Sequence, residues 1–265
     1  MAKVRISILC DNRCESTRLE TEHGFSCLLE VGDFKLLIDM GETDLFLRNA
    51  GKMKINMSNV QNALITHGHY DHGGGASHLR GKDIFIHGKT FQRRFKPPTE
   101  EFDLKEETLV VENKDKNNWL EIDSNVVING SVFLIPNIPV THEFERGSAW
   151  ILEDGSVDEL ADEICVAVKT DKGLVIISGC AHRGICSTVD YARWMTGESR
   201  VSSVIGGFHL RKLDDKVEKT LEYFKANPVG SLLMAHCNSD EVIEKFKEEL
   251  PNMAQMISTG MVVEL

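Results

Sequence analysis

The sequence lacks the features that would place the protein in a membrane, in a secretory pathway or on nucleic acid. No apolar run approaches the about 20 residues of a membrane-spanning helix. The N-terminus enters a strand-like pattern at Val4 and shows no secretory signal. The formal net charge is −11, without the basic field of a general nucleic-acid binder. We therefore expect a cytoplasmic protein, with neither a membrane nor a nucleic acid as its partner.

The spacing of the cysteines also gives no sign of a metal site closed by thiolates. The chain has seven cysteines, an odd number, and none of them forms a C-x-x-C pair or a ferredoxin-type spacing. Mostly free thiols in a reducing compartment fit this pattern best.

The chemistry-bearing side chains of the first half are concentrated in residues 63–75, which read A-L-I-T-H-G-H-Y-D-H-G-G-G. The apolar start predicts a buried strand, and the polar part predicts a loop at its end. In an extended loop, residues two apart face the same way, so His67 and His69 can bind one metal ion together. Asp71 and His72 follow the bend and can face a second ion.

Four such side chains within six positions indicate a metal centre, whereas the alternative is a histidine-rich surface loop with satisfied hydrogen bonds. Neutral imidazoles with a carboxylate suit zinc, or iron or manganese, with one position left open for water. We therefore expect two divalent metal ions, with zinc as the first choice.

At these residues the chain resembles the metallo-β-lactamase-fold superfamily, whose motif is H-x-H-x-D-H after a buried strand. The resemblance implies an α/β fold of the αββα type, a four-layer sandwich with two sheets inside and helices outside. The length allows one domain or two, and the resemblance covers nearly the whole chain. We expect residues 1–265 to form a single domain whose two similar halves meet near residues 90–145.

Apolar periodicity predicts both strands and helices along the chain. Strands are expected at residues 4–10, 25–31, 34–39, 63–65, 84–87, 108–111, 126–128, 132–135, 164–170, 174–178, 201–205, 231–235 and 260–265. Helices are expected at residues 43–51, 72–79, 184–195, 215–226 and 239–250. Residues 90–145 are less regular and are expected to place loops over the site. Within them, the basic run at 93–96 is either a solvated helix face or a contact for an anionic substrate.

Further metal ligands must come from the second half, where three apolar strands each end near a histidine. These histidines are His182, His209 and His236. In most of the superfamily a strand here ends in Gly-Asp, and that Asp bridges two metals, but this chain has Gly179-Cys180. Cys180 is either a metal-bound thiolate or an inert buried thiol.

The order Gly-Cys-small-His, with the later Gly-Gly-Phe-His-Leu and His-Cys segments, resembles the methanopterin-synthase-like (dihydropteroate-synthase-like) branch of the superfamily. This branch is the 7,8-dihydropterin-6-methyl-4-(β-D-ribofuranosyl)aminobenzene 5′-phosphate synthase type. The resemblance implies that His182 and His236 are metal ligands, and their strand-end placement agrees with that role.

Three other positions complete the predicted site. Asp39 ends a strand where the resemblance implies a residue that orients a ligand or the metal loop, and capping of the next helix is the alternative. His209 follows two glycines and is expected to act on the substrate near its ordinary pKa, in catalysis together with Asp71. The alternatives for His209 are a metal ligand and a surface histidine. Arg211 is expected to favour an anionic substrate.

The leading functional hypothesis is a metal-dependent hydrolase in which two cations activate water against an ester, phosphodiester or related bond. The branch resemblance implies a small-molecule substrate, either a pterin or a phosphoribosyl-aromatic metabolite. The first alternative is a di-iron redox protein, although such members typically carry Glu where this chain has His69. The second alternative is a non-catalytic binding protein with a closed metal site. The sequence leaves the oligomeric state open.

Overall fold

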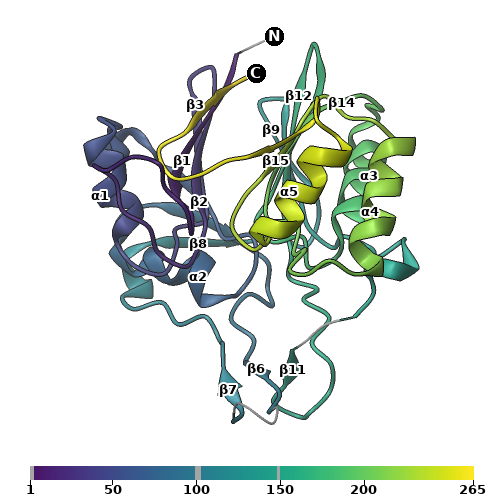
Figure 1. Cartoon of the computed structure of the whole chain (residues 1–265). Coiled ribbons are helices and arrows are strands. Elements are labelled where there is room, and N and C mark those ends of the chain that lie inside the picture. The colour runs from purple at the N-terminus through teal and green to yellow at the C-terminus, as the bar shows by residue number, and fades with distance from the viewer. Residues whose placement is uncertain (1–2, 99–102, 148–149) are drawn as a thin grey trace.

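Two seven-stranded β-sheets pack face to face, and helices cover their outer sides (Figure 1). The computed structural model that shows this arrangement describes residues 3–98, 103–147 and 150–265. The four layers confirm the predicted αββα sandwich. In the described part of the chain, no helix combines the length and the apolarity needed to cross a membrane.

The first sheet has the strand order β17-β1-β2-β3-β4-β5-β8. Its strands are β1 (Val4–Cys10), β2 (Ser26–Val31), β3 (Phe34–Ile38), β4 (Asn62–Leu64), β5 (Asp83–Ile86), β8 (Asn118–Glu121) and β17 (Val262–Glu264). β1, β2 and β3 pair antiparallel, whereas β3, β4, β5 and β8 pair in parallel. Helices α1 (Leu45–Lys52) and α2 (Tyr70–Gly73) lie on its outer side.

The second sheet has the strand order β16-β15-β14-β13-β12-β10-β9. Its strands are β9 (Val126–Ile128), β10 (Val132–Ile135), β12 (Cys165–Thr170), β13 (Gly173–Ser178), β14 (Val201–Gly206), β15 (Leu232–Met234) and β16 (Ala254–Met256). Helices α3 (Ile185–Thr196), α4 (Asp215–Ala226) and α5 (Asp240–Glu249) cover its outer side (Figure 1). β13 to β16 pair in parallel.

Parallel pairing decides where the chemistry-bearing loops lie. Because parallel strands run in the same direction, the loops that follow them all leave the sheet at the carboxyl ends of its strands. The loop after β4 carries the H-x-H-x-D-H motif, and the loops after β13, β14 and β15 carry His182, His209 and His236. Segments more than 160 residues apart in sequence therefore meet at one end of the sandwich; for example, His72 contacts His236.

The packing of β13 shows how the sandwich holds together. Leu174 and Ile176 are buried against the helices of the second sheet, whereas Val175 and Ile177 are buried between the two sheets. A strand that is covered on both faces has a continuous apolar sequence, and for this reason the sequence predicted a strand here. The opposite side of the inter-sheet core comes from strands such as β1 and β2, through Ile6 and similar residues.

A small three-stranded sheet projects from the same end of the molecule as these loops (Figure 1). Its strands are β6 (Arg94–Lys96), β7 (Lys105–Glu106) and β11 (Ile151–Leu152), in the order β11-β6-β7. The helix-face interpretation of residues 93–96 was therefore wrong. Arg94 is 1% exposed, and its guanidinium nitrogens lie 3.2 Å from carboxylate oxygens of Asp158 and of Asp162.

Other predicted elements need smaller corrections. Residues 108–111 do not form a strand, because only an isolated bridge joins Thr108 to His69. The predicted helix at 72–79 is the short α2 followed by a 3-10 segment, Gly74–His78, because three consecutive glycines weaken an α-helix. β6, β7, β8, β11 and β16 were not predicted, since each is short and several are polar. The remaining 3-10 segments are Met57–Asn59, Lys114–Lys116 and Glu143–Glu145.

Candidate metal centre

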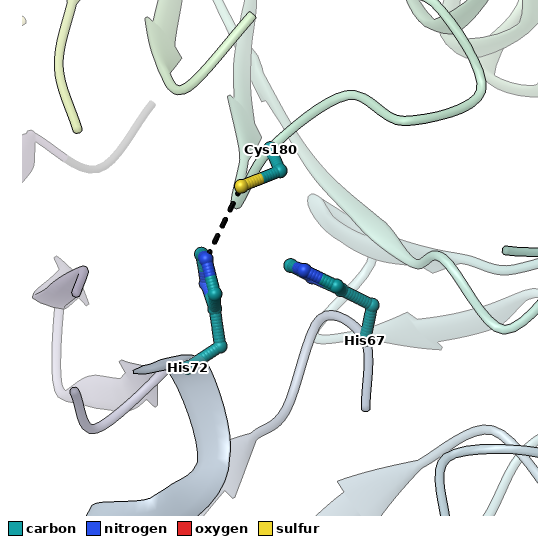
Figure 2. Close-up of side chains that lie close together, drawn as sticks. All are labelled: His67, His72 and Cys180. Carbon is teal, nitrogen blue, oxygen red and sulfur yellow. Dashed lines mark hydrogen bonds between the residues drawn. The ribbon is translucent and has the colours of Figure 1, made fainter. Parts of the chain in front are cut away.

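The four ligand-type residues of the motif and two of the later histidines converge on one buried cluster. Its members are His67, His69, Asp71, His72, His182 and His236, and each is at most 9% exposed. Figure 2 shows His67, His72 and Cys180 with their side chains directed toward one another, from the motif loop and the loop after β13.

Three imidazoles form the first ligand set. One ligand atom each from His67, His69 and His182 lies within 4.8 Å of the others. His67 Nε2 is 3.0 Å from His69 Nδ1, and His182 Nε2 is buried without a hydrogen-bond partner among the described residues. Three imidazole nitrogens with an open fourth position match the ligand set of a catalytic zinc ion.

A carboxylate and two imidazoles form the second ligand set. Asp71 Oδ2 lies 3.3 Å from His236 Nε2 and 3.9 Å from His72 Nε2, and the two Nε2 atoms are 3.1 Å apart. His23 Nε2 lies 3.2 Å from the same Asp71 oxygen. Sequence reasoning missed His23 because it lies in an irregular polar loop that gives no periodic signal.

Cys180 stands between the two sets. Its Sγ is 3.2 Å from His72 Nε2, and its ligand atom groups with those of His67 and His72 and, separately, with those of His236 and Cys237. Burial raises the pKa of this thiol, so deprotonation requires a positive partner at the site. The sulfur thus faces ligand-type nitrogens, which is the position expected for a metal-bound thiolate.

The protonation state of the histidines fits metal binding. Burial lowers the pKa of His67, His69 and His182 well below the ordinary value, so these rings are neutral and offer lone pairs. Burial also acts to lower the pKa of His72, but the carboxylates of Asp39 and Asp71 raise it to about 9. A divalent cation would replace the proton that holds His72 between these two carboxylates.

Asp39 orients the motif loop through hydrogen bonds to its backbone and side chains. Its carboxylate accepts hydrogen bonds from the Thr66 backbone N–H at 2.8 Å and from the Thr66 hydroxyl at 2.8 Å, and it lies 2.7 Å from His72 Nδ1. This contact leaves His72 Nε2 free to face the ligand cluster. The alternative helix-capping role was wrong, because α1 begins only at Leu45, after Asp44.

Three more buried carboxylates hold the motif loop and the other ligand loops by their backbones. Asp162 accepts the Gly68 N–H at 2.7 Å, and Asp11 accepts the His236 N–H at 2.6 Å. Glu163 accepts the N–H groups of His182 and Arg183 at 2.8 and 2.7 Å. Burial raises the pKa of Glu163 to about 7 and that of Asp11 to about 6. None of the three carried a sequence signal, because isolated acidic residues are common in loops.

The surroundings of His209 differ from the prediction. Burial and the nearby Arg211 lower the pKa of His209 well below its ordinary value, so the expected titration near neutrality was wrong. Its ring packs 4.4 Å from that of His182 and 5.6 Å from that of Trp150, measured between centroids. The glycines before it do not clear room for a substrate, since a Cβ on Gly207 would lie 2.6 Å from Cys237 Sγ.

Strained backbone occurs at four positions in or beside this centre. Asp39, Ala181, His209 and His236 have φ angles of 53°, 52°, 52° and 49°, a region that residues other than glycine rarely adopt. Such strain persists where surrounding contacts over-determine the conformation, and it is typical of functional sites.

His87 and His142 lie outside the cluster and contact Asn137 and Asp190 instead.

A cavity of about 530 Å³ opens onto the ligand cluster. His69, Asp71, His182 and His236 contribute to its lining. Its walls also hold four cationic side chains, which are Arg13, Lys96, Lys105 and Arg211. Lys96 and Lys105 come from the small projecting sheet, and both lie within 3.3 Å of the Glu107 carboxylate. The cavity therefore joins a potential metal floor to walls that attract anions.

Comparisons with known proteins agree with this geometry. A family model described as the anti-Pycsar protein Apyc1 matches residues 17–123. The metallo-β-lactamase-fold protein YhfI of Bacillus subtilis is 12% identical, covers 100% of both chains and has a TM-score of 0.62, which indicates a shared fold. The crystal structure of Tm1679, a metal-dependent hydrolase of the β-lactamase superfamily, is 30% identical, covers 99% of both chains and has a TM-score of 0.86.

The chain belongs to the metallo-β-lactamase superfamily. It is also similar to the 7,8-dihydropterin-6-methyl-4-(β-D-ribofuranosyl)-aminobenzene-5′-phosphate synthase of Methanocaldococcus jannaschii, with 28% identity over 92% of this chain and 90% of the relative. The branch resemblance seen in the sequence is thereby confirmed. These similarities also support the prediction that this superfamily member is an enzyme.

Asp39 provides a first test of the centre. Replacing Asp39 by Asn removes the negative charge that orients His72. It also replaces one acceptor oxygen by an amide NH₂ group, which then faces a group that donates a hydrogen bond to Asp39 in the wild type. We expect the Asp39→Asn enzyme to bind zinc 10–100-fold more weakly, measured by competition with a chromophoric chelator. Asp33→Asn, at the exposed turn between β2 and β3, is the matched control. Unchanged zinc affinity in Asp39→Asn would contradict the orienting role.

Glu163 provides a test in the metal-free enzyme. Its pKa is raised from 4.5 to about 7 in the folded state, so its contribution to stability is complete below about pH 4.5 and is lost as the pH rises through 7. The difference in unfolding free energy between wild type and Glu163→Gln should therefore fall by roughly 2–3 kcal/mol from pH 5 to pH 8. Denaturant titrations measure it, with Glu222→Gln on the exposed side of α4 as control. A pH-independent difference would disprove the raised pKa.

Proposed function

We propose that the protein is a hydrolase with a dinuclear metal centre that cleaves an ester, phosphodiester or related bond in a small anionic molecule. The observation that carries this proposal is the pair of adjacent ligand sets at the base of a cavity with cationic walls. His67, His69 and His182 would hold one ion, and the second set would hold the other. The second set is Asp71, His72 and His236, with Cys180 between the two.

Two divalent cations held there would lower the pKa of water and polarise the bond under attack. The protein's own contribution begins with the neutral imidazoles, which are ready to bind cations without first losing protons. The backbone N–H groups of the loops that carry them donate hydrogen bonds to buried carboxylates, so the ligand atoms are positioned before a metal arrives. Zinc suits a set dominated by imidazole with a thiolate nearby.

The charge of the walls supports an anionic substrate. Arg13 is already engaged with Asp240 at 2.7 Å, and the two lysines share Glu107. Arg211 also lines the cavity, but it differs from the other three cations because it has no ion-pair partner among the described residues. A guanidinium in this position can bind a phosphate or carboxylate through two parallel hydrogen bonds.

The similarity to the dihydropterin ribofuranosyl-aminobenzene phosphate synthase supports a narrower substrate class. We infer a metabolite that combines a phosphate ester with an aromatic group, either a pterin or a phosphoribosyl-aromatic compound. The phosphate would meet the cationic wall. A cavity of about 530 Å³ falls within the usual range of sites for small molecules.

Metal dependence tests the proposal directly. We expect the protein purified without added metal to contain about two divalent ions per chain. His67→Ala and His69→Ala should each lower the metal content and abolish hydrolysis in a screen of phosphodiesters, esters and pterin phosphates. His78→Ala, a change away from the cluster, should keep both. Unchanged metal content in both His67→Ala and His69→Ala would exclude the proposed centre.

Arg211 tests the anionic substrate. Arg211→Ala should keep the metal content and raise KM for a phosphorylated substrate about tenfold or more, with a smaller change in kcat, because the guanidinium binds substrate without touching the reacting bond. The control is Arg18→Ala, an exposed arginine that does not line the cavity. Increasing salt should weaken binding to wild type more than to Arg211→Ala. Equal KM values for wild type and Arg211→Ala would remove Arg211 from substrate binding.

A further inference from the structure

We propose that Cys237 supplies a second thiolate, beside Cys180, to the metal position surrounded by Asp71, His72 and His236. The proposal rests on the dinuclear centre proposed above and adds a ligand to one half of it. The centre would then consist of two unlike positions, one with imidazoles alone and one rich in sulfur.

The position of Cys237 is the first argument. One ligand atom each from Cys180, His236 and Cys237 lies within 4.8 Å of the others, and Cys237 is only 6% exposed. Neighbouring residues in an extended chain normally point to opposite sides. Here His236 has a φ of 49°, and the left-handed turn allows His236 and Cys237 to present ligand atoms to the same point.

The surroundings of the sulfur are the second argument. Cys237 Sγ accepts the backbone N–H of His209 at 3.3 Å, a contact that stabilises a thiolate. The Cys180 carbonyl, 3.8 Å from the sulfur, is only a distant acceptor for a thiol proton.

The Gly-Gly-Phe-His segment explains how this space is made. A Cβ on Gly207 would lie 2.4 Å from the Gly179 carbonyl oxygen and 2.6 Å from Cys237 Sγ, so glycine lets both the neighbouring loop and the sulfur approach here. His209 adopts a φ of 52°, a strained conformation in which its N–H meets the sulfur.

The chemistry of the metal position follows from its ligands. The His236 imidazole and two thiolates lie together there, and such a sulfur-rich set favours zinc, whereas sulfur disfavours magnesium and manganese. We therefore expect the position near His236 to bind thiophilic ions selectively, whereas the position of His67, His69 and His182 accepts a wider range.

Cobalt substitution tests the proposal without depending on activity. Reduced, metal-free protein is loaded with Co²⁺, and sulfur-to-cobalt charge-transfer absorption is measured per bound ion. We expect a strong band in wild type that falls by about half in Cys237→Ser and in Cys180→Ser and vanishes in the double variant, because each thiolate contributes its own band. Cys165→Ala, a buried cysteine in β12, should leave the band unchanged.

A second measurement leaves Cys237 itself intact, in case Cys237→Ser does not fold. X-ray absorption of the zinc-loaded Cys180→Ser protein should still show sulfur at about 2.3 Å from zinc. Absence of sulfur there, or a cobalt band that Cys180→Ser abolishes while Cys237→Ser leaves it intact, would overturn the role of Cys237 and keep the dinuclear centre. A wild-type protein that binds no metal would overturn the centre as a whole, and this proposal with it.

Discussion

The architecture of the site depends on hydrogen bonds from backbone N–H groups to buried carboxylates. Each loop that carries a candidate ligand is held in this way: Thr66 by Asp39, Gly68 by Asp162, His182 by Glu163 and His236 by Asp11. A carboxylate accepts such bonds more strongly than a neutral acceptor does, and it accepts several at once. The loops are thus fixed by their backbones, and the imidazoles remain free for ligation.

This arrangement has an electrostatic consequence. Four carboxyl groups buried around one cluster are costly unless cations or protons compensate them. Arg94 compensates Asp162 and the neighbouring Asp158, while the raised pKa values of Glu163 and Asp11 show that burial favours their protonated forms. The proton held by His72 balances Asp39 and Asp71. Divalent cations at the proposed centre would supply this compensation directly, which couples metal binding to stability.

The two sheets contribute unequally to the proposed chemistry. The first sheet supplies the motif loop, with hard and borderline ligands, whereas the second supplies the histidines at its strand ends and both cysteines at the cluster. The small sheet formed by β6, β7 and β11 adds lysines to the cavity wall. The proposed metal floor therefore comes from loops of both large sheets, its sulfur-rich side from the second sheet, and the cationic wall from the small sheet together with Arg13 and Arg211.

From the sequence, the dense ligand motif H-x-H-x-D-H indicated a metal site and carried the resemblance that implied the αββα fold, and apolar runs predicted most of the buried strands. Tertiary structure decided what depends on contacts between distant segments. Asp11, Asp162 and Glu163 gave no signal, since each acts through another residue's backbone N–H. Arg94 read as part of a basic surface run, yet two aspartates some 65 residues later bury it. His209 was misjudged because its pKa reflects burial, and burial is a property of the folded chain.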